Sequence, residues 1–259
     1  MKLRRLGALL ATAAVLLTGA TTATAQTEHK PKPTIVLLHG AFADGASWSE
    51  VTGKLQRDGY TVVVPAVPLR GIAADTAYLS GVLAAVPGPK VLVGHSYGGA
   101  LVSELAGTSG VKSLVYVAAF IPRAGETIGG LNAKYPGSEL GPDTTNAISY
   151  SGGVDLVVKP EAFHRVFSAD LPARQAAVLG ASQRPINAAA FDEPVATTAP
   201  AGLPKYAVIP TGDHAIPPAA ERFMAERAHA KTVEIPAASH LVALSHSSAV
   251  TQVIEQAAQ

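Results

Sequence analysis

The stretch VLVGHSYGGA, residues 91–100, decides the fold of this chain. It is an apolar run of β-strand type that breaks into the pattern Gly-x-Ser-x-Gly, and a helix-type run, residues 100–106, follows it. In this pattern the serine sits on a turn too tight for side chains two residues away on either side. Gly94 and Gly98 have no β-carbon to clash there, so we expect Ser96 to present its hydroxyl at the top of a sheet.

Short apolar runs alternate with helical patterns on both sides of this turn, which is typical of a mostly parallel sheet. Six runs are predicted strands: residues 34–38, 61–64, 90–93, 112–118, 205–209 and 232–235. Five segments are predicted helices: residues 47–57, 73–85, 97–107, 218–228 and 247–256. The sequence therefore predicts an α/β fold with a sheet of about six strands flanked by helices.

Residues 122–204 interrupt this rhythm. A segment of this length is too long for a plain connection between two strands. It begins with glycine-rich turns and continues with helical patches at residues 160–170, 171–181 and 187–191. Phe163, Val166, Phe167, Leu171 and Val178 supply an apolar face. We therefore expect a helical cap inserted over the site that Ser96 marks.

The N-terminus has the pattern of a secretory signal peptide: a basic start, an apolar run at residues 6–17 and the small-x-small sequence of residues 23–25. The apolar run is shorter than the ~20 residues of a membrane-spanning helix, so no stable membrane anchor is expected. We predict that residues 1–25 are removed and that a secreted domain of residues 26–259 remains. Export by the general or the twin-arginine route stays open, and the absence of cysteine rules out disulfides and a lipid anchor on cysteine.

The charge of the chain gives no indication of a nucleic-acid partner. The formal net charge is +1, and removal of the three basic residues of the predicted leader lowers it to about −2. Charged residues make up only 15% of the chain and form no run, whereas the hydrophobic content of 48% is ample for a large core. Oligomeric state is not indicated by any feature of the sequence.

A serine hydroxyl needs a base to remove its proton, and the base needs an acid to orient it. In hydrolases built on this turn the acid and then the histidine follow the serine along the chain. Asp213 and His240 occur in that order, each in a loop after a predicted strand. We predict Ser96 as nucleophile, His240 as base and Asp213 as acid, with Glu126 as a rival acid.

The oxyanion of an acyl-transfer reaction needs two backbone N–H donors. Tyr97, the residue after the nucleophile, is predicted to supply one of them. The second is expected from the loop after the first strand, where Gly40 permits the bend. Ala41 is the predicted donor and Phe42 the alternative, while His39 is expected to be structural.

The other histidines carry no motif. His214 is expected to have a surface or loop role, and His246 to cap or pack at the start of the last helix. The remaining three, His29, His164 and His229, are expected to lie on the surface. They show no metal-ligand spacing such as His-Glu-x-x-His, so neither a metal nor another cofactor is predicted.

These motifs resemble the α/β-hydrolase superfamily. More narrowly, the chain is similar to the branch of plant methyl-ester esterases, hydroxynitrile lyases and their small bacterial esterase relatives. Further likeness lies in Trp48, residues 117–120, Pro217-Pro218 and Phe223-Met224. The resemblance covers nearly the whole chain from Pro33 onward and implies an α/β-hydrolase fold, with Ser96, Asp213 and His240 as triad and Ala41 and Tyr97 as oxyanion donors.

Two positions distinguish between the reactions of that branch. Its cyanohydrin-cleaving members carry a lysine directly after the catalytic histidine and a threonine in the first loop, where this chain has Leu241 and Gly40. We therefore expect a serine esterase acting on small, hydrophobic carboxylic esters through an acyl-enzyme. A cyanohydrin or carbon–carbon lyase, a non-catalytic ligand-binding module, and amide or peptide hydrolysis remain the alternatives.

Overall fold

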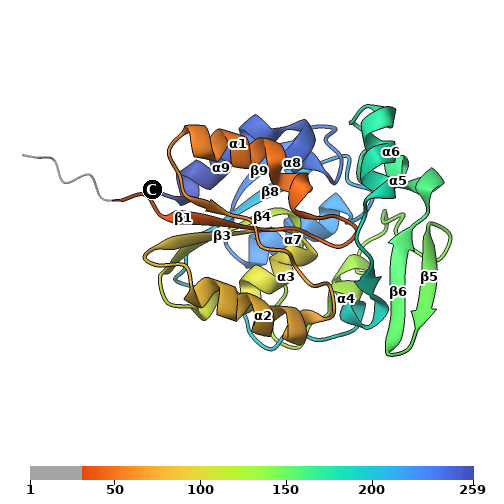
Figure 1. Cartoon of the computed structure of the whole chain (residues 1–259), viewed down its shortest axis with the longest axis horizontal. Helices are drawn as coiled ribbons and strands as arrows, with labels where there is room; N and C mark the ends of the chain where they lie inside the picture. Colours follow the sequence, from red (N-terminus) through yellow and green to blue (C-terminus); the bar gives the residue numbers. More distant parts are fainter. Residues whose placement is uncertain (1–30) are drawn as a thin grey trace, which may run out of the picture. The chain divides into compact units, whose positions relative to one another are not determined.

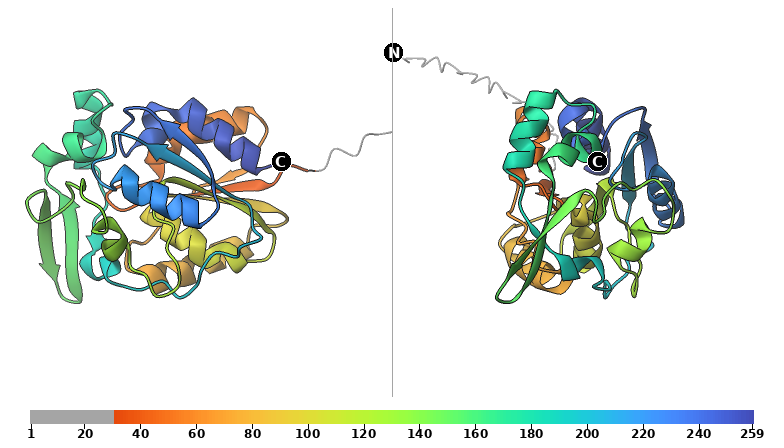
Figure 2. Two further views of the ribbon diagram at one scale, coloured as in Figure 1. Left: turned by 180° about the vertical axis from the view of Figure 1, so that it is seen from behind. Right: turned by 90° about the vertical axis from the view of Figure 1, so that its right-hand side faces the viewer.

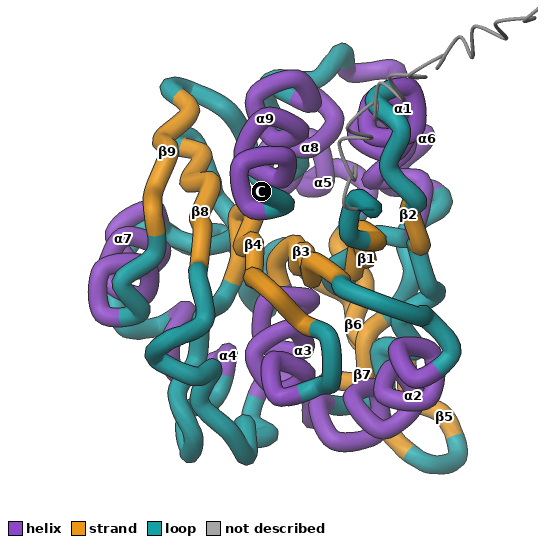
Figure 3. The backbone as a smooth tube through the Cα atoms, turned by 90° about the vertical axis from the view of Figure 1, so that its left-hand side faces the viewer, coloured by secondary structure: helices purple, strands orange, loops and turns teal. Residues whose placement is uncertain are grey.

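Six parallel strands form the central sheet, in the order β2-β1-β3-β4-β8-β9 (Figure 3). The computed structural model describes residues 31–259, and the predicted signal peptide lies outside them. The strands are β1 (Thr34–Leu38), β2 (Val62–Val63), β3 (Lys90–Ser96), β4 (Val111–Ala119), β8 (Lys205–Pro210) and β9 (Lys231–Ile235). All six predicted strands are present, and the predicted α/β sheet is confirmed.

Helices cover both faces of this sheet because the strand residues alternate between two apolar cores. Ile35 and Leu37 of β1 belong to one core, and Val36 and Leu38 belong to the other. The first core is covered by α1 (Ser49–Arg57), α8 (Val242–Ser245) and α9 (Ser247–Ala257). The second is covered by α2 (Ile72–Ala84), α3 (Tyr97–Glu104) and α7 (Pro218–Arg227), on the opposite side of the sheet (Figure 1).

The insertion between β4 and β8 is a mixed cap, not a purely helical one. Its helices are α4 (Ile128–Asn132), α5 (Pro160–Phe167) and α6 (Ala173–Ala181), and α5 and α6 match predicted patches. A small antiparallel sheet of β5 (Thr145–Tyr150), β6 (Gly153–Val158) and β7 (Ile186–Asn187) accompanies them (Figure 2). The sequence analysis missed these strands because β5 is largely exposed and carries little apolar alternation.

Two charged side chains tie the cap to the sheet domain. The Arg70 guanidinium donates to both carboxylate oxygens of Asp155 in β6, at 2.9 and 3.1 Å. The Glu193 carboxylate accepts the Ile72 and Ala73 N–H groups, at 2.7 and 2.9 Å. These two N–H groups begin α2 and have no partner within the helix, so Glu193 satisfies them as a capping residue. Both contacts lie where the loop after β2 leads into α2, so the cap is held at the start of this helix.

Candidate active site

Ser96 ends β3 and lies on a sharply bent turn before α3. Its backbone has φ 54° and ψ −121°, a conformation that costs a residue with a side chain ~1–3 kcal/mol. The turn is possible only with glycine on both sides. A β-carbon on Gly94 would lie 2.4 Å from the Gly98 carbonyl oxygen, and one on Gly98 would lie 2.6 Å from the Leu38 carbonyl oxygen. The strand-turn-helix geometry that the sequence pattern predicts is therefore present.

Asp213 and His240 follow β8 and β9, and the structure brings their side chains together. His240 Nδ1 lies 2.6 Å from Asp213 Oδ2, and both side chains are fully buried. The other carboxylate oxygen, Oδ1, accepts the backbone N–H groups of Ala215 at 2.7 Å and Ile216 at 2.9 Å. These two bonds fix the rotamer of Asp213, so that Oδ2 is held toward the imidazole.

The second ring nitrogen of His240 is unpaired. His240 Nε2 is buried and has no hydrogen-bond partner among residues 31–259. The ring lies against the edge of Phe167 in α5, at 4.9 Å between centroids, and beside the ring of His95, at 4.6 Å. The His95 Nε2–H donates to the His240 carbonyl oxygen at 3.0 Å, which ties the histidine loop to the residue before Ser96. No hydrogen bond joins Ser96 to His240 in the described chain, and catalytic hydrogen bonds are often long without substrate.

Two neighbouring histidines are neutral and structural. Burial lowers the pKa of His39, and its Nε2 accepts the Val67 N–H at 3.0 Å. The proton of His39 is therefore on Nδ1, which donates to the Gly40 carbonyl oxygen at 2.9 Å. Burial, and next the proximity of His240, hold the pKa of His95 well below its usual value. Neither ring adds positive charge near Ser96.

The predicted oxyanion donors lie beside Ser96. Ala41 and Tyr97 line the same small pocket as Ser96, and neither N–H is used in a hydrogen bond within the described chain. The first loop approaches the nucleophile so closely that a β-carbon on Gly40 would lie 2.6 Å from Ser96 Cβ. Phe42, the alternative donor, has a left-handed backbone with φ 59° and a buried ring.

The rival acid Glu126 is occupied elsewhere. Its carboxylate pairs with both terminal nitrogens of Arg227 in α7, one at 2.5 Å. The hydrogen bonds from Arg227 hold the pKa of Glu126 below its usual value, so this carboxylate is an ionised partner of a cation. The structure places Asp213 against His240 and Glu126 against Arg227.

The other histidines have partners of their own or are exposed. The pairs are His214 with Glu139, His246 with Ser245 and Asp170, and His164 with the Leu171 carbonyl group. His229 is exposed, and His29 lies outside the described residues. His164 is half-buried, and its ring bonds the loop between α5 and α6. Over residues 31–259, no three His, Asp or Glu side chains gather as a metal site, and no helix is long and apolar enough to cross a membrane.

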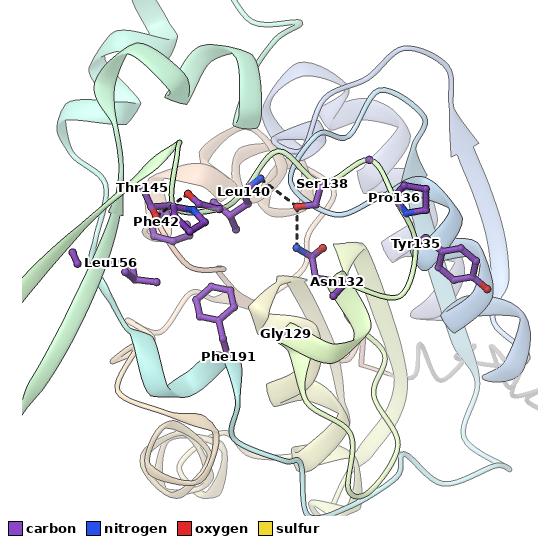
Figure 4. A pocket seen from close by; sticks show the side chains of 15 residues that line it. Phe42, Gly129, Asn132, Tyr135, Pro136, Ser138, Leu140, Thr145, Leu156 and Phe191 are labelled. Carbon is purple, nitrogen blue, oxygen red and sulfur yellow. Dashed lines mark hydrogen bonds between the residues drawn. The ribbon is translucent and has the colours of Figure 1, made fainter.

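A large apolar cavity adjoins the nucleophile pocket (Figure 4). The pocket at Ser96 has a volume of only about 10 Å³, whereas the cavity measures about 690 Å³ and is lined, except for Phe42, by residues of the cap. Phe42, Leu140 and Phe191 line both spaces and so stand between them. Polar groups on the cavity wall are few; Asn132 donates to Ser138 Oγ at 2.9 Å. The cavity fits an apolar group attached to whatever reaches Ser96.

Two residues near the site were missed by the sequence analysis. Phe167 was expected only as part of an apolar cap face, but it packs against the His240 ring. Glu221 in α7 is buried beside Asp213. One signal for Glu221 was available: it falls on the helix face of Ala220 and Met224, where a carboxylate is out of place.

This chain has a parallel α/β sheet and a serine on a strained strand-to-helix turn, and an Asp-His pair follows its last two strands. These features define the class of nucleophile-elbow proteins. The sequence pattern of the Alpha/beta hydrolase family matches residues 35–253, and the chain belongs to this family. The predicted fold and the resemblance to this superfamily are thus confirmed.

Several solved structures share this fold. A polyneuridine aldehyde esterase superposes with a TM-score of 0.74 at 19% identity and covers 88% of this chain and 100% of its own. A pyrethroid hydrolase from Sphingobium faniae JZ-2 gives a TM-score of 0.71 at 23% identity, covering 87% and 97%. A methylesterase from Arabidopsis gives 0.73 at 17% identity, covering 87% and 98%.

A closer sequence match is shorter. The carbendazim hydrolyzing esterase of Nocardioides sp. (strain SG-4G) is 31% identical over 110 residues, or 36% of this chain. The match spans 44% of that relative's length.

Proposed function

We propose that this protein is a carboxylic ester hydrolase that uses Ser96 as nucleophile, His240 as base and Asp213 as orienting acid. One observation carries the proposal. Asp213 and His240 form a fully buried pair, in which His240 Nε2 has no hydrogen-bond partner among the described residues. The hydrogen bond from His95 to the His240 carbonyl oxygen joins the loop of His240 to the turn at Ser96. An unpaired basic nitrogen in an apolar setting is suited to accept the proton of a hydroxyl nucleophile. The esterase names of the relatives agree with this chemistry.

The first half of the reaction forms an acyl-enzyme. His240 Nε2 takes the Ser96 proton while Ser96 Oγ attacks the ester carbonyl carbon. The carbonyl oxygen becomes an oxyanion, to which the Ala41 and Tyr97 N–H groups donate. His240 is then an imidazolium, stabilised by the buried Asp213 carboxylate at 2.6 Å. It returns the proton to the leaving alkoxide, and the alcohol departs.

The second half releases the acid. A water molecule loses a proton to His240 Nε2 and attacks the acyl carbon of the Ser96 ester. The tetrahedral intermediate collapses, Ser96 Oγ leaves, and His240 gives the proton back to it. The carboxylic acid is released and the enzyme returns to its starting state without a cofactor.

The substrate class follows from the two adjoining spaces. The pocket at Ser96 has little free volume, so it suits the carbonyl group and a small substituent. The apolar cavity beyond Phe42, Leu140 and Phe191 suits a hydrophobic acyl or alcohol group. We propose small to medium hydrophobic esters as substrates.

The lyase alternative is disfavoured by two contacts. A β-carbon on Gly40 would lie 2.6 Å from Ser96 Cβ, so the first loop has no room for the threonine of the cyanohydrin-cleaving members. Leu241, which stands where those members have lysine, is buried, and its N–H donates to the Phe167 carbonyl oxygen at 3.0 Å. Amide hydrolysis needs the same groups and is a further arm of the test.

The experiment is turnover of p-nitrophenyl acetate, butyrate and octanoate by the purified protein and by Ser96→Ala, with a p-nitroanilide and mandelonitrile as parallel substrates. We expect ester turnover that the variant loses while its circular dichroism spectrum stays unchanged. Retained turnover in Ser96→Ala contradicts the proposal, and cleavage of mandelonitrile alone favours the lyase.

We further propose that the protein is exported and that residues 1–25 are removed, on the pattern of its N-terminal sequence. Expression of the full chain in a bacterial host, followed by mass spectrometry of the secreted or periplasmic fraction, tests this. A product that begins at Gln26 is expected, and an uncleaved chain in the cytoplasm contradicts it.

A further inference from the structure

Glu221 is a buried carboxylic acid that the ester-cleavage steps do not use. It lies on the buried face of α7 with Ala220, Met224 and Ala225, and only 2% of its surface is exposed. Neither of its side-chain oxygens accepts a hydrogen bond from any described donor. An ionised carboxylate without donors is strongly disfavoured in a buried position.

The charged groups around Glu221 do not favour its ionisation. Asp213 lies within hydrogen-bonding reach, and Glu234 of β9 adds further negative charge. Arg222 is the neighbouring cation, but its guanidinium donates to Glu234, at 2.7 and 2.8 Å, on the exposed side of the helix. Burial, and next the charge of Asp213, raise the pKa of Glu221 well above its usual value. Both effects favour the protonated, neutral form of Glu221.

Asp213 has one acceptor position left for a donor. An ionised carboxylate offers about four lone-pair sites. Two are filled by the Ala215 and Ile216 N–H groups on Oδ1, and a third by His240 Nδ1–H on Oδ2. The remaining site is on Oδ2, the oxygen that orients the imidazole. A protonated Glu221 is the neighbouring group that supplies a hydrogen-bond donor for this site.

We propose that Glu221 is a positioning residue whose neutral carboxylic acid donates a hydrogen bond to Asp213 and holds that carboxylate against His240. The role rests on the proposed esterase function, because it acts on the acid of that triad. The two carboxyl groups then share one negative charge and one proton. Loss of the Glu221 proton removes the bond and sets two like charges side by side in a buried place.

The protonation state of Glu221 is measurable without any turnover. A protonated carboxylic acid has a carbonyl stretch in the infrared that a carboxylate and an amide lack. At pH 8 we expect this band in the wild type and in Glu226→Gln, the matched control with an exposed glutamate of the same helix. The band is expected to vanish in Glu221→Gln. A wild-type spectrum without it overturns the proposal.

Thermal unfolding supplies a second measurement that is independent of activity. A carboxyl group whose pKa is raised on folding adds stability below its unfolded pKa, and that stability is lost as pH rises through the folded pKa. The melting temperature of the wild type is therefore expected to fall relative to that of Glu221→Gln as pH rises above 4.5, the ordinary pKa of this carboxyl group. If the melting temperatures of the two proteins change with pH in parallel until both unfold at alkaline pH, Glu221 carries no proton in the folded protein and the proposal is contradicted.

Kinetics separate positioning from mere packing. Glutamine at position 221 can donate through its amide, so Glu221→Gln is expected to keep kcat within about threefold of the wild type. Methionine fills the same space without a donor, so Glu221→Met is expected to lose about tenfold in kcat at unchanged KM. Equal kcat values for the two variants contradict the positioning role. If Glu221→Met does not fold, the infrared and melting measurements on Glu221→Gln still decide the proposal. Absence of ester turnover in the wild type would count against the proposed function and leave those two measurements valid.

Discussion

His240 Nδ1 lies 2.6 Å from Asp213 Oδ2, although the two residues belong to loops after different strands and are 27 residues apart in the chain. The contact exists because β8 and β9 are parallel neighbours, so that their carboxyl ends meet at the same edge of the sheet. It sets the imidazole tautomer: with a proton on Nδ1, Nε2 is left as the acceptor. Every step of the proposed ester hydrolysis depends on that assignment.

Asp213→Asn should disable the site without unfolding it. The amide oxygen must take the place of Oδ1, because the Ala215 and Ile216 N–H groups point there. The amide N–H₂ then faces His240 Nδ1 and forces the proton onto Nε2, which can no longer accept from Ser96. We expect kcat for p-nitrophenyl butyrate to fall by about 10³–10⁴-fold. The matched control is Glu126→Gln, the rival acid, which should keep kcat within about twofold; the reverse pattern would make Glu126 the acid.

Gly40→Ala should reduce activity through a steric effect on Ser96. The new methyl group would lie 2.6 Å from Ser96 Cβ and 3.0 Å from the His95 carbonyl oxygen, so the first loop and its Ala41 donor must shift. Loss of one oxyanion donor typically costs about 10²–10³-fold in kcat. Gly81→Ala is the control, since a β-carbon there meets nothing within 4 Å. Steady-state kinetics with circular dichroism measure the effect, and unchanged kcat in Gly40→Ala argues against this loop as part of the site.

Phe191→Ala should widen the passage from Ser96 to the cavity. Phe191 lines both the small pocket and the 690 Å³ cavity, so its truncation joins the two spaces. We expect the ratio of kcat/KM for p-nitrophenyl octanoate to that for the acetate to rise by about fivefold, a change typical of a few buried methylene groups. Val178→Ala, at an exposed position of α6, is the control. An unchanged ratio would mean that the substrate does not enter this cavity.

Glu126 should stabilise the fold only at pH values at which its carboxyl group is ionised. Arg227 lowers the pKa of Glu126 below its ordinary 4.5 on folding. A carboxyl group with a lowered folded pKa adds stability above its unfolded pKa and loses it as pH falls through the folded pKa. Glu126→Gln should therefore lower the melting temperature at pH 7 and have little effect near pH 3. Scanning calorimetry at both pH values measures this, and an equal effect at both would assign the loss to packing.

The six strands of the sheet and the bend at Ser96 were predictable because each leaves a local signal. The runs around Leu37 and Val93 are apolar and bounded by turn residues, and Gly94 and Gly98 mark a turn that excludes side chains. Asp213 and His240 follow Ser96 in the order found in hydrolases built on this turn, and each comes after a predicted strand. Their contact depends on the pairing of β8 with β9, which the structure shows.

The cap and the surroundings of the site were less predictable because they depend on long-range contacts. The hairpin of β5 and β6 is largely exposed, and its local signals were the Val- and Leu-rich run of residues 154–158 and the turn at Gly152 and Gly153, which take positive φ values of 122° and 159°. The packing of Phe167 on His240 joins residues 73 positions apart in sequence, which no local pattern specifies. The burial of Glu221 beside Asp213 becomes apparent only once α7 is placed on the sheet.

The central claim is that Ser96 is a nucleophile activated by His240, and covalent labelling tests it most directly. The purified protein is incubated with a fluorophosphonate, digested, and mapped by mass spectrometry, with His240→Ala and Ser96→Ala as companions. We predict one phosphonylated residue, Ser96, with a labelling rate that falls by at least about 10³-fold in His240→Ala and to zero in Ser96→Ala. Labelling of a different residue, or a rate at Ser96 that does not depend on His240, would contradict the account.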